Sequence, residues 1–135
     1  MFTPLDDRTL VAGQIAIDDL AEARRLGVTV VVNNRPDDEE PGQPTSAAIE
    51  AACTDLGLTY RHIPISHGIG PAQVEAMQDA LHAASEGKLL AYCRSGTRST
   101  LIWALARRED GASPDELKKA AEQAGHTLGP IAHLL

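Results

Sequence analysis

Residues 88–108 read KLLAYCRSGTRSTLIWALARR, an apolar run followed by a glycine-containing loop and a second apolar segment. The first run, Lys88–Cys93, has the length and composition of a buried strand. The segment from about Arg98 to Glu109 is apolar almost all round at Leu101–Leu105, which predicts a buried crossover helix. A strand that passes through a short loop into a helix is the basic unit of an α/β fold.

Three glycines divide the preceding chain into similar units. Each one follows a segment with helical spacing and precedes a strand-like run; the glycines are Gly27, Gly57 and Gly87, and the runs are Val28–Asn33, Leu58–Ile65 and Lys88–Cys93. Asp18, Thr45 and Pro71 are expected to start the three helices, since these residue types favour a cap or a first turn. We expect each glycine to be the left-handed residue that ends its helix.

Two further elements complete the predicted fold. Val11–Ala16 predicts a leading strand, and Ser113-Pro114-Asp115-Glu116 predicts the capped start of a last helix that closes at Gly125. The alternation predicts an α/β fold of three layers, with a short, mostly parallel sheet flanked by helices. At this length we expect residues 1–135 to form a single domain. Ligands of such sheets bind at the carboxyl ends of the strands.

The composition excludes several classes of function. Twelve basic residues against 19 acidic ones give a net charge of −7, which argues against a nucleic-acid or anionic-membrane partner. No apolar run approaches the roughly 20 residues of a membrane span, and the N-terminus lacks the pattern of a signal sequence. Two cysteines are too few for a disulfide scaffold, so we expect reduced thiols in the cytoplasm. One of them, Cys53, lies on the apolar face of a predicted helix and is expected in the core.

The other cysteine, Cys93, lies at the junction between the predicted strand and the loop that leads into the helix, where its thiol can act as a nucleophile. Backbone N–H groups and the positive end of the helix dipole favour its thiolate there, and Gly96 allows the loop to curl around an anion. Arg98 is expected to hold two oxygens of a tetrahedral oxyanion through its planar fork. Thr97 or Ser99 is expected to donate a hydrogen bond to the sulfur or to cap the helix. The loop residues predicted to form this oxyanion cradle are Arg94, Ser95, Gly96, Thr97 and Ser99.

Several motifs together resemble the phosphatase-like domain of the beta-lactamase hydrolase-like family. They are Gly13-Gln14, Asn33–Asp37, Gly42–Pro44, Tyr60–Pro64 and Tyr92–Ser99. The likeness covers roughly residues 5–108, and it implies the fold of cysteine-dependent dual-specificity phosphatases. It also implies that Cys93 is the nucleophile and that Arg98 binds the oxyanion, with no cofactor.

The loop departs from the usual pattern of cysteine phosphatases. Those enzymes have five residues between the cysteine and the arginine and usually a histidine before the cysteine, whereas this chain has four residues and Tyr92. A six-residue loop that begins Cys-Arg is similar to the sulfur-transfer loop of rhodaneses. Three hypotheses therefore stand: a phosphatase acting on a small phosphate ester through a cysteinyl-phosphate, a sulfurtransferase using a Cys93 persulfide, and an anion-binding module without turnover.

A phosphatase also needs a proton donor for its leaving group. The loop Ser66–Gly70, where related enzymes carry an aspartate, has no carboxylate, so His67 is one candidate. The acids after the strand Val28–Asn33 are the alternative, with Asp37 first among Asp37, Asp38, Glu39 and Glu40, although this run also fits a solvated surface turn. Arg35 is expected either to contact the anion or to pair with these acids. The remaining histidines show no metal-ligand spacing, so we predict no metal.

Overall fold

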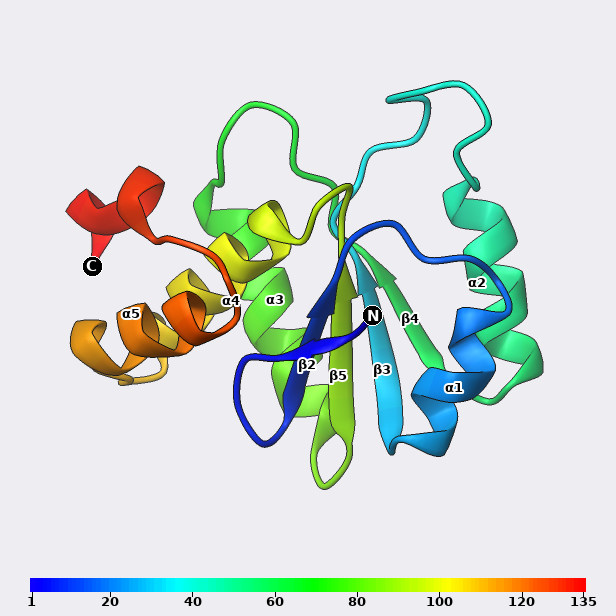
Figure 1. The fold of residues 1–135 in the computed structure, drawn as a ribbon, viewed down its shortest axis with the longest axis horizontal. Coiled ribbons are helices and arrows are strands. Elements are labelled where there is room, and N and C mark those ends of the chain that lie inside the picture. Colours follow the sequence, from blue (N-terminus) through cyan, green and yellow to red (C-terminus); the bar gives the residue numbers. More distant parts are fainter.

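The computed structural model describes residues 1–135 as a five-stranded sheet with helices on both faces (Figure 1). The strand order is β1-β2-β5-β3-β4, and every neighbouring pair is parallel except β1 and β2. The strands are β1 (Thr3–Pro4), β2 (Thr9–Ala12), β3 (Val28–Asn33), β4 (Thr59–His62) and β5 (Lys88–Tyr92). β5 is thus the middle strand, and its flanking strands run in the same direction.

The helices form two outer layers. Helices α1 (Asp19–Arg25) and α2 (Ser46–Asp55) cover one face of the sheet, while α3 (Pro71–Ala84) and α4 (Thr97–Glu109) cover the other (Figure 1). Helix α5 (Pro114–Gln123) packs against α4, and the 3-10 helix η1 (Gly129–Leu134) ends the chain. A buried apolar cluster lies on each side of the sheet, with 21 residues on the α3 side and 12 on the α1 side. The predicted three-layer α/β fold is confirmed.

Most helix starts follow the predicted capping chemistry. The hydroxyl of Thr45 accepts a hydrogen bond from the N–H of Ala48, and Ser113 accepts one from Glu116 in the same way. Each contact satisfies a first-turn N–H group that has no partner within its helix. Asp18 stands at the start of α1 but forms no such bond, so its predicted capping role is wrong.

The strands are shorter than the sequence pattern predicts. The leading strand is Thr9–Ala12 rather than Val11–Ala16, because the chain leaves β5 after Ala12 and turns across the loop that follows Cys93. Strand β4 ends at His62 and does not reach Ile65, although the N–H groups of Ile63 and Ile65 still donate to the carbonyls of Asn33 and Asn34. The two-residue strand β1 is too short to have a sequence signature.

Two details of the helices also differ from expectation. No strand follows α4, so this buried helix is not a crossover between strands. Ser85, with φ of 47°, is the left-handed residue after α3 in place of the expected Gly87. Thr29 side-chain atoms lie 2.5 and 2.6 Å from where a Cβ of Gly87 would stand, so that glycine is required for close packing. Gly27 and Gly57 have the predicted positive φ.

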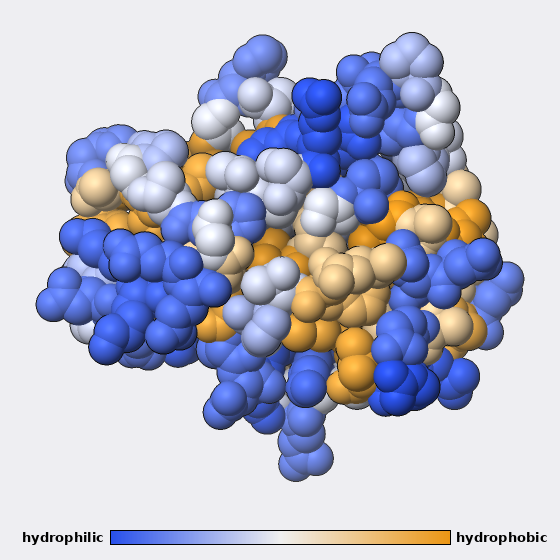
Figure 2. Space-filling view, in the orientation of Figure 1, coloured by the Kyte–Doolittle hydropathy of each residue, from blue (hydrophilic) through white to orange (hydrophobic).

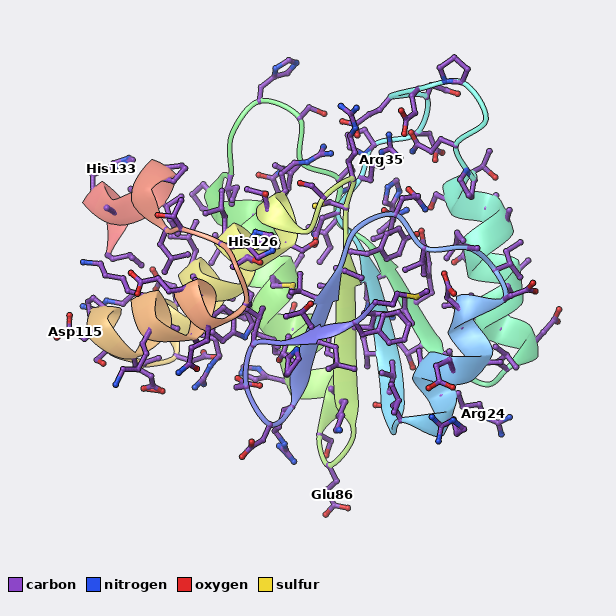
Figure 3. All side chains as sticks on the ribbon, viewed as in Figure 1. Arg24, Arg35, Glu86, Asp115, His126 and His133 are labelled. Atoms are coloured by element: carbon purple, nitrogen blue, oxygen red, sulfur yellow. The ribbon has the colours of Figure 1, made fainter.

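The sheet register brings several loops together. Tyr92 is paired with Ala12 on one side and with Asn33 on the other, and Asn33 is paired with His62. The four parallel strands therefore end at the same level, and the loops that follow them meet at one edge. Arg35 lies at this edge and Glu86 lies at the opposite one (Figure 3).

We expect Leu90→Ala to destabilise the protein, because Leu90 is fully buried in the middle strand. Truncation of such a side chain leaves a cavity and costs about 2–5 kcal/mol of unfolding free energy. Leu134→Ala is the matched control, since Leu134 is exposed and such changes stay within about 0.5 kcal/mol. Chemical denaturation measures both variants, and similar midpoints for the two would contradict the assigned core.

Candidate active site

Cys93 follows β5 directly and lies at the base of the loop that opens α4. The loop curls at Gly96, whose φ of 91° is in the left-handed region, as the sequence predicts. In this conformation the N–H of Gly96 donates a hydrogen bond to Cys93 Sγ over 3.1 Å. A backbone N–H aimed at the sulfur stabilises negative charge on it. The Cys93 side chain has no exposed surface in this arrangement.

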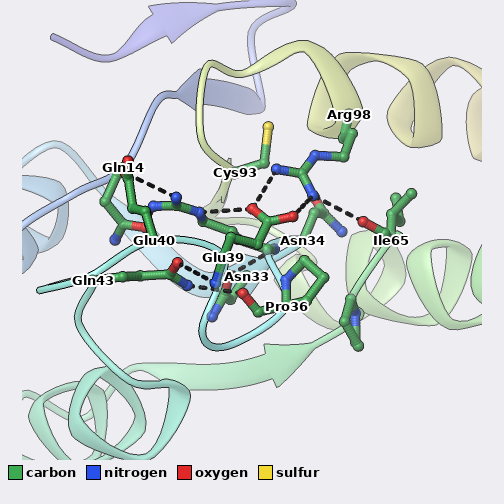
Figure 4. A network of polar contacts seen from close by, with 12 residues as sticks. Gln14, Asn33, Asn34, Pro36, Glu39, Glu40, Gln43, Ile65, Cys93 and Arg98 are labelled. Carbon is green, nitrogen blue, oxygen red and sulfur yellow. Dashed lines mark hydrogen bonds and ion pairs between the residues drawn. The ribbon is translucent and has the colours of Figure 1, made fainter. Parts of the chain in front are cut away.

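Arg98 projects from the first turn of α4 to the same place (Figure 4). Its Nη1 donates a hydrogen bond to the Ile65 carbonyl over 2.9 Å, which fixes the guanidinium plane. Both terminal nitrogens contact the carboxylate of Glu39, at 2.7 Å from Nη1 to Oε2 and 2.8 Å from Nη2 to Oε1. The two terminal nitrogens of Arg98 thus hold both oxygens of a side-chain carboxylate, whereas the predicted contact of Arg98 with a tetrahedral oxyanion stays a prediction.

This ion pair shifts the pKa values of both partners. The hydrogen bonds with Glu39 raise the pKa of Arg98, and the charge of Cys93 adds to the effect. The hydrogen bonds from Arg98, followed by those from Arg35, lower the pKa of Glu39 to about 2. Glu39 is thus a carboxylate at neutral pH.

Arg35 supports Glu39 from the other side. Its side chain is 1% exposed and contacts three groups: Nε donates to Glu39 at 2.8 Å, Nη2 to Glu40 at 2.9 Å and Nη1 to Gln14 at 3.0 Å. Burial alone would lower the pKa of Arg35, but the two carboxylates outweigh it and raise the pKa. Of the two roles considered for Arg35, the structure shows the pairing with neighbouring acids.

The chain after β2 packs directly on the loop that follows Cys93. A Cβ on Gly13 would stand 2.9 Å from the Arg94 carbonyl oxygen, so only glycine fits at this position. The next residue, Gln14, donates its N–H to the same carbonyl over 3.2 Å. Gly13-Gln14 therefore fixes the loop backbone, while the Arg94 side chain is exposed to solvent.

The hydroxyl groups of the loop do not contact the sulfur. Ser99 is buried and donates to the side-chain oxygen of Asn34 over 2.8 Å, and Asn34 donates in turn to the Ile63 carbonyl over 3.1 Å. Thr97 accepts a hydrogen bond from Ser95 at the exposed side of the loop. The expectation that Thr97 or Ser99 would donate to Cys93 is wrong, because Asn34 takes the Ser99 hydroxyl and ties α4 to the end of β3.

Neither candidate proton donor has a hydrogen bond to Cys93 or Arg98, and both assignments stay predictions. Asp37 accepts a hydrogen bond from the N–H of Ser46 over 2.8 Å, so its carboxylate is engaged at the start of α2. His67 is exposed and forms none of the hydrogen bonds of the site. The acidic run is also not a solvated turn throughout, because Glu39 reaches the guanidinium group of Arg98.

Sequence reasoning missed the contacts that several residues make in or beside the site. Glu39, Asn34 and Gln14 contact its charged and buried groups, and Gln43 holds the segment that carries Glu39. The signal for three of them is present in the motifs Gly13-Gln14, Asn33–Asp37 and Gly42–Pro44 that carry the family resemblance. The fifth is His126, after α5, whose Nε2 would be 3.2 Å from a Cβ on Gly96 (Figure 3).

The surface around the site is mostly hydrophilic. Figure 2 shows polar residues over the edge of the sheet where the loops after β3 and β4 project. None of the helices is both long enough and apolar enough to span a lipid bilayer.

The sheet order, the cysteine-bearing loop after the middle strand and the arginine at the helix start define a cysteine-phosphatase-like α/β domain. The chain belongs to the family of the beta-lactamase hydrolase-like protein, phosphatase-like domain, whose profile matches residues 2–110. This finding confirms the resemblance read from the sequence.

Individual relatives agree with this assignment. A beta-lactamase hydrolase-like protein of Xylella fastidiosa is 36% identical over 127 residues, which is 93% of this chain and 29% of that protein. The chain thus spans less than a third of this curated relative. A candidate phosphatase of known structure from Neisseria meningitidis is 32% identical with a TM-score of 0.80, over 98% of this chain and 94% of that one. Human DUSP28 shares the fold at 20% identity, with a TM-score of 0.68 over 92% and 82% of the chains.

We expect Gly96→Ala to weaken anion binding at least about tenfold, because a left-handed alanine costs roughly 1–2 kcal/mol and disturbs the N–H that faces Cys93. Gly111→Ala is the matched control. Gly111 has a similar φ of 104°, and nothing lies within 4 Å of its substituent. Sulfate binding by calorimetry measures both variants, and equal affinities would show that the Gly96 conformation does not shape the site.

Proposed function

We propose that this domain is a cysteine-dependent phosphatase that cleaves small phosphate monoesters through a cysteinyl-phosphate on Cys93. One observation supports the proposal above all: the Cys93 sulfur, the Gly96 N–H and the guanidinium group of Arg98 lie together at the start of α4. This guanidinium group already binds two oxygens of a carboxylate. The first-turn N–H groups of α4 have no partner within the helix and are available to further oxygens of a tetrahedral anion. Membership in a phosphatase-like family supports the same assignment.

In the first step the Cys93 thiolate attacks phosphorus while the bond from phosphorus to the ester oxygen breaks. Charge on the equatorial oxygens is held by Arg98 and the loop N–H groups, which are pre-arranged before the reaction. In this scheme the leaving oxygen takes its proton from water, since neither Asp37 nor His67 has a hydrogen bond to Cys93 or Arg98. We therefore expect esters with good leaving groups, such as nitrophenyl phosphate, to react fastest.

In the second step water attacks phosphorus, the bond from phosphorus to sulfur breaks, and the thiolate and inorganic phosphate are restored. The cysteine thus divides one difficult displacement into two easier ones. No metal or cofactor takes part in either step.

A sulfurtransferase is the second candidate, favoured by the length of the loop. Four residues separate Cys93 from Arg98, which makes a six-residue loop similar to that of rhodaneses. The Cys93 thiolate would then attack the outer sulfur of thiosulfate, so that a persulfide forms on Cys93, the sulfur–sulfur bond of thiosulfate breaks and sulfite leaves. A mass gain of one sulfur after exposure to thiosulfate, without nitrophenyl phosphate turnover, would favour this candidate. Binding of anions with neither activity would favour a binding module.

The decisive variants for the proposed function are Cys93→Ser and a matched pair of arginine substitutions. We expect Cys93→Ser to abolish nitrophenyl phosphate turnover. Arg98→Lys should cost roughly ten- to a hundredfold, because an ammonium group lacks the fork and loses charge-assisted hydrogen bonds of about 1.5–3 kcal/mol each. Arg94→Lys should cost far less, since the Arg94 side chain is exposed. Steady-state kinetics measure all three, and near-wild-type rates in Arg98→Lys would refute the proposed role of Arg98.

A further inference from the structure

One imidazole ring lies against the loop that carries Cys93 and takes no part in the contacts described so far. His126 follows α5, outside residues 2–110 that match the family profile, and its Nε2 and Cε1 would be 3.2 and 3.4 Å from a Cβ on Gly96 (Figure 3). The residue is half-buried. Unlike the rings of His62 and His82, which contact Arg35 and Asp110, the His126 ring has no hydrogen-bond partner in the chain.

The end of α5 holds His126 in this position. Gly125, with φ of 87°, turns the chain, and the N–H groups of Gly125 and His126 donate to the carbonyls of Glu122 and Ala121. These two hydrogen bonds form a Schellman motif, which fixes the residue after the glycine relative to the helix. Helix α5 in turn packs on α4, the helix that begins at the loop. His126 is therefore kept beside Gly96 by the regular end of a helix.

The ring is close enough to act on an anion bound near Cys93. Gly96 donates its N–H to Cys93 Sγ over 3.1 Å, and the His126 ring lies against the same glycine. These contacts and ordinary bond lengths place His126 Nε2 no more than about 9 Å from the sulfur. The Debye length at 0.1 M salt is about 10 Å, so a charge on the ring is felt at the sulfur.

The site has little positive charge of its own to offer a dianion. Arg35 and Arg98 are paired with the carboxylates of Glu39 and Glu40, so these four charges cancel. A thiolate on Cys93 adds one negative charge, which repels a second anion. An additional cation next to the loop would therefore change the affinity for a dianion, and a protonated His126 ring supplies one.

Few other ionisable groups lie on the elements around this ring. The loop, α4, α5 and η1 contribute Cys93, Arg94, Arg98, Glu122 and His133. The end of β2, which approaches Gly96 through the Ala12 carbonyl, contributes no ionisable side chain. None of these groups forms an ion pair with His126, and Arg98 is paired with Glu39 instead. Protonation of the ring therefore adds a full positive charge to this side of the loop.

We propose that His126 is a positioning residue of the anion site, whose protonated ring strengthens the binding of tetrahedral dianions beside Cys93. The inference rests on the proposed function only in taking the loop as the anion site. Histidine is the side chain that ordinarily changes its charge between pH 5 and 8. The ring acts across Gly96, without contact with the ligand. Affinity for a dianion therefore rises as pH falls through this range, and by linkage the bound dianion draws a proton onto the ring.

The test measures the affinity for inorganic sulfate against pH in proteins that carry Cys93→Ser. This substitution removes the titration of the thiol, sulfate stays a dianion, and Glu39, with a pKa of about 2, stays ionised. With His126 present, we expect the affinity to rise about threefold or more between about pH 8 and about pH 5.5. With His126→Gln added, the rise should be less than about 1.5-fold. Thermal unfolding first shows that each variant is folded.

Two further variants separate the charge of the ring from its packing. His126→Lys keeps a positive charge throughout this pH range, so we expect it to bind sulfate tightly at every pH, with little dependence on pH. His82→Gln is the matched control, since His82 is exposed near the end of α3, at the opposite edge of the sheet. It should keep the full pH dependence of the protein with Cys93→Ser alone.

Proton uptake gives an independent readout of the same linkage. Calorimetry at about pH 7 in two buffers of different ionisation enthalpy measures the protons taken up when sulfate binds. We expect uptake in the protein with Cys93→Ser and clearly less when His126→Gln is added. If His126 served only for packing, its replacement would weaken sulfate binding equally at every pH and would leave the proton uptake unchanged.

The outcomes separate this inference from the proposed function, because sulfate binding requires no turnover. Equal pH dependence and equal proton uptake with and without His126 would overturn the inference, even if the wild-type protein hydrolyses phosphate esters. Proton-linked sulfate binding that disappears in His126→Gln would support it, even if no ester is turned over. Absence of sulfate binding at every pH would overturn it together with the anion site on which it rests.

Discussion

The burial of one guanidinium group organises the whole site. Arg35 follows β3 and is almost completely enclosed, and a charge in such a place is costly unless it is paired and hydrogen-bonded. Its partners come from two directions: Glu39 and Glu40 from its own loop, and Gln14 from the loop after β2. Glu39 also pairs with Arg98. The carboxylate that Arg35 needs as a partner therefore connects the end of β3 to the start of α4.

The sheet makes this pairing geometrically possible. β5 lies between β2 and β3, and the paired ends at Ala12, Tyr92 and Asn33 place their three loops side by side. Each loop contributes a different chemical group: Gln14 fixes the backbone at Arg94, Asn34 holds Ser99, and Cys93 carries the sulfur. A parallel sheet with a different strand order would separate groups that act together here.

The sequence was informative wherever one local rule governs a residue. Thr45 and Ser113 were predictable as helix caps, and Gly96 as the left-handed turn beside Cys93, because each depends on its nearest neighbours. Periodicity was equally sufficient for the outer layers, since α1, α2, α3 and α5 each bury one face, while the apolar run of α4 indicated a helix buried on most sides.

The sequence was less informative where a side chain had to select a distant partner. Asp37 and Glu39 are two residues apart in one acidic run, yet the first is bound to the start of α2 and the second to Arg98. Nothing in the local pattern distinguishes them, because the choice depends on the path of residues 36–43 in space. The partner of the Ser99 hydroxyl was unpredictable for the same reason, since its acceptor, Asn34, is 65 positions away in the chain.

The shared carboxylate also changes how the domain attracts ions from a distance. Arg98 and Arg35 already have carboxylate partners within hydrogen-bonding range, and the whole chain carries a net charge of −7, so these two arginines attract distant anions only weakly. Arg94, exposed beside the loop, is the cation of the loop without such an ion-pair partner. An approaching anion therefore meets weak attraction from the site and repulsion from the chain as a whole, and salt that screens this repulsion should favour the encounter. Because both arginines are already paired with carboxylates, their charges act on an anion mainly at short range.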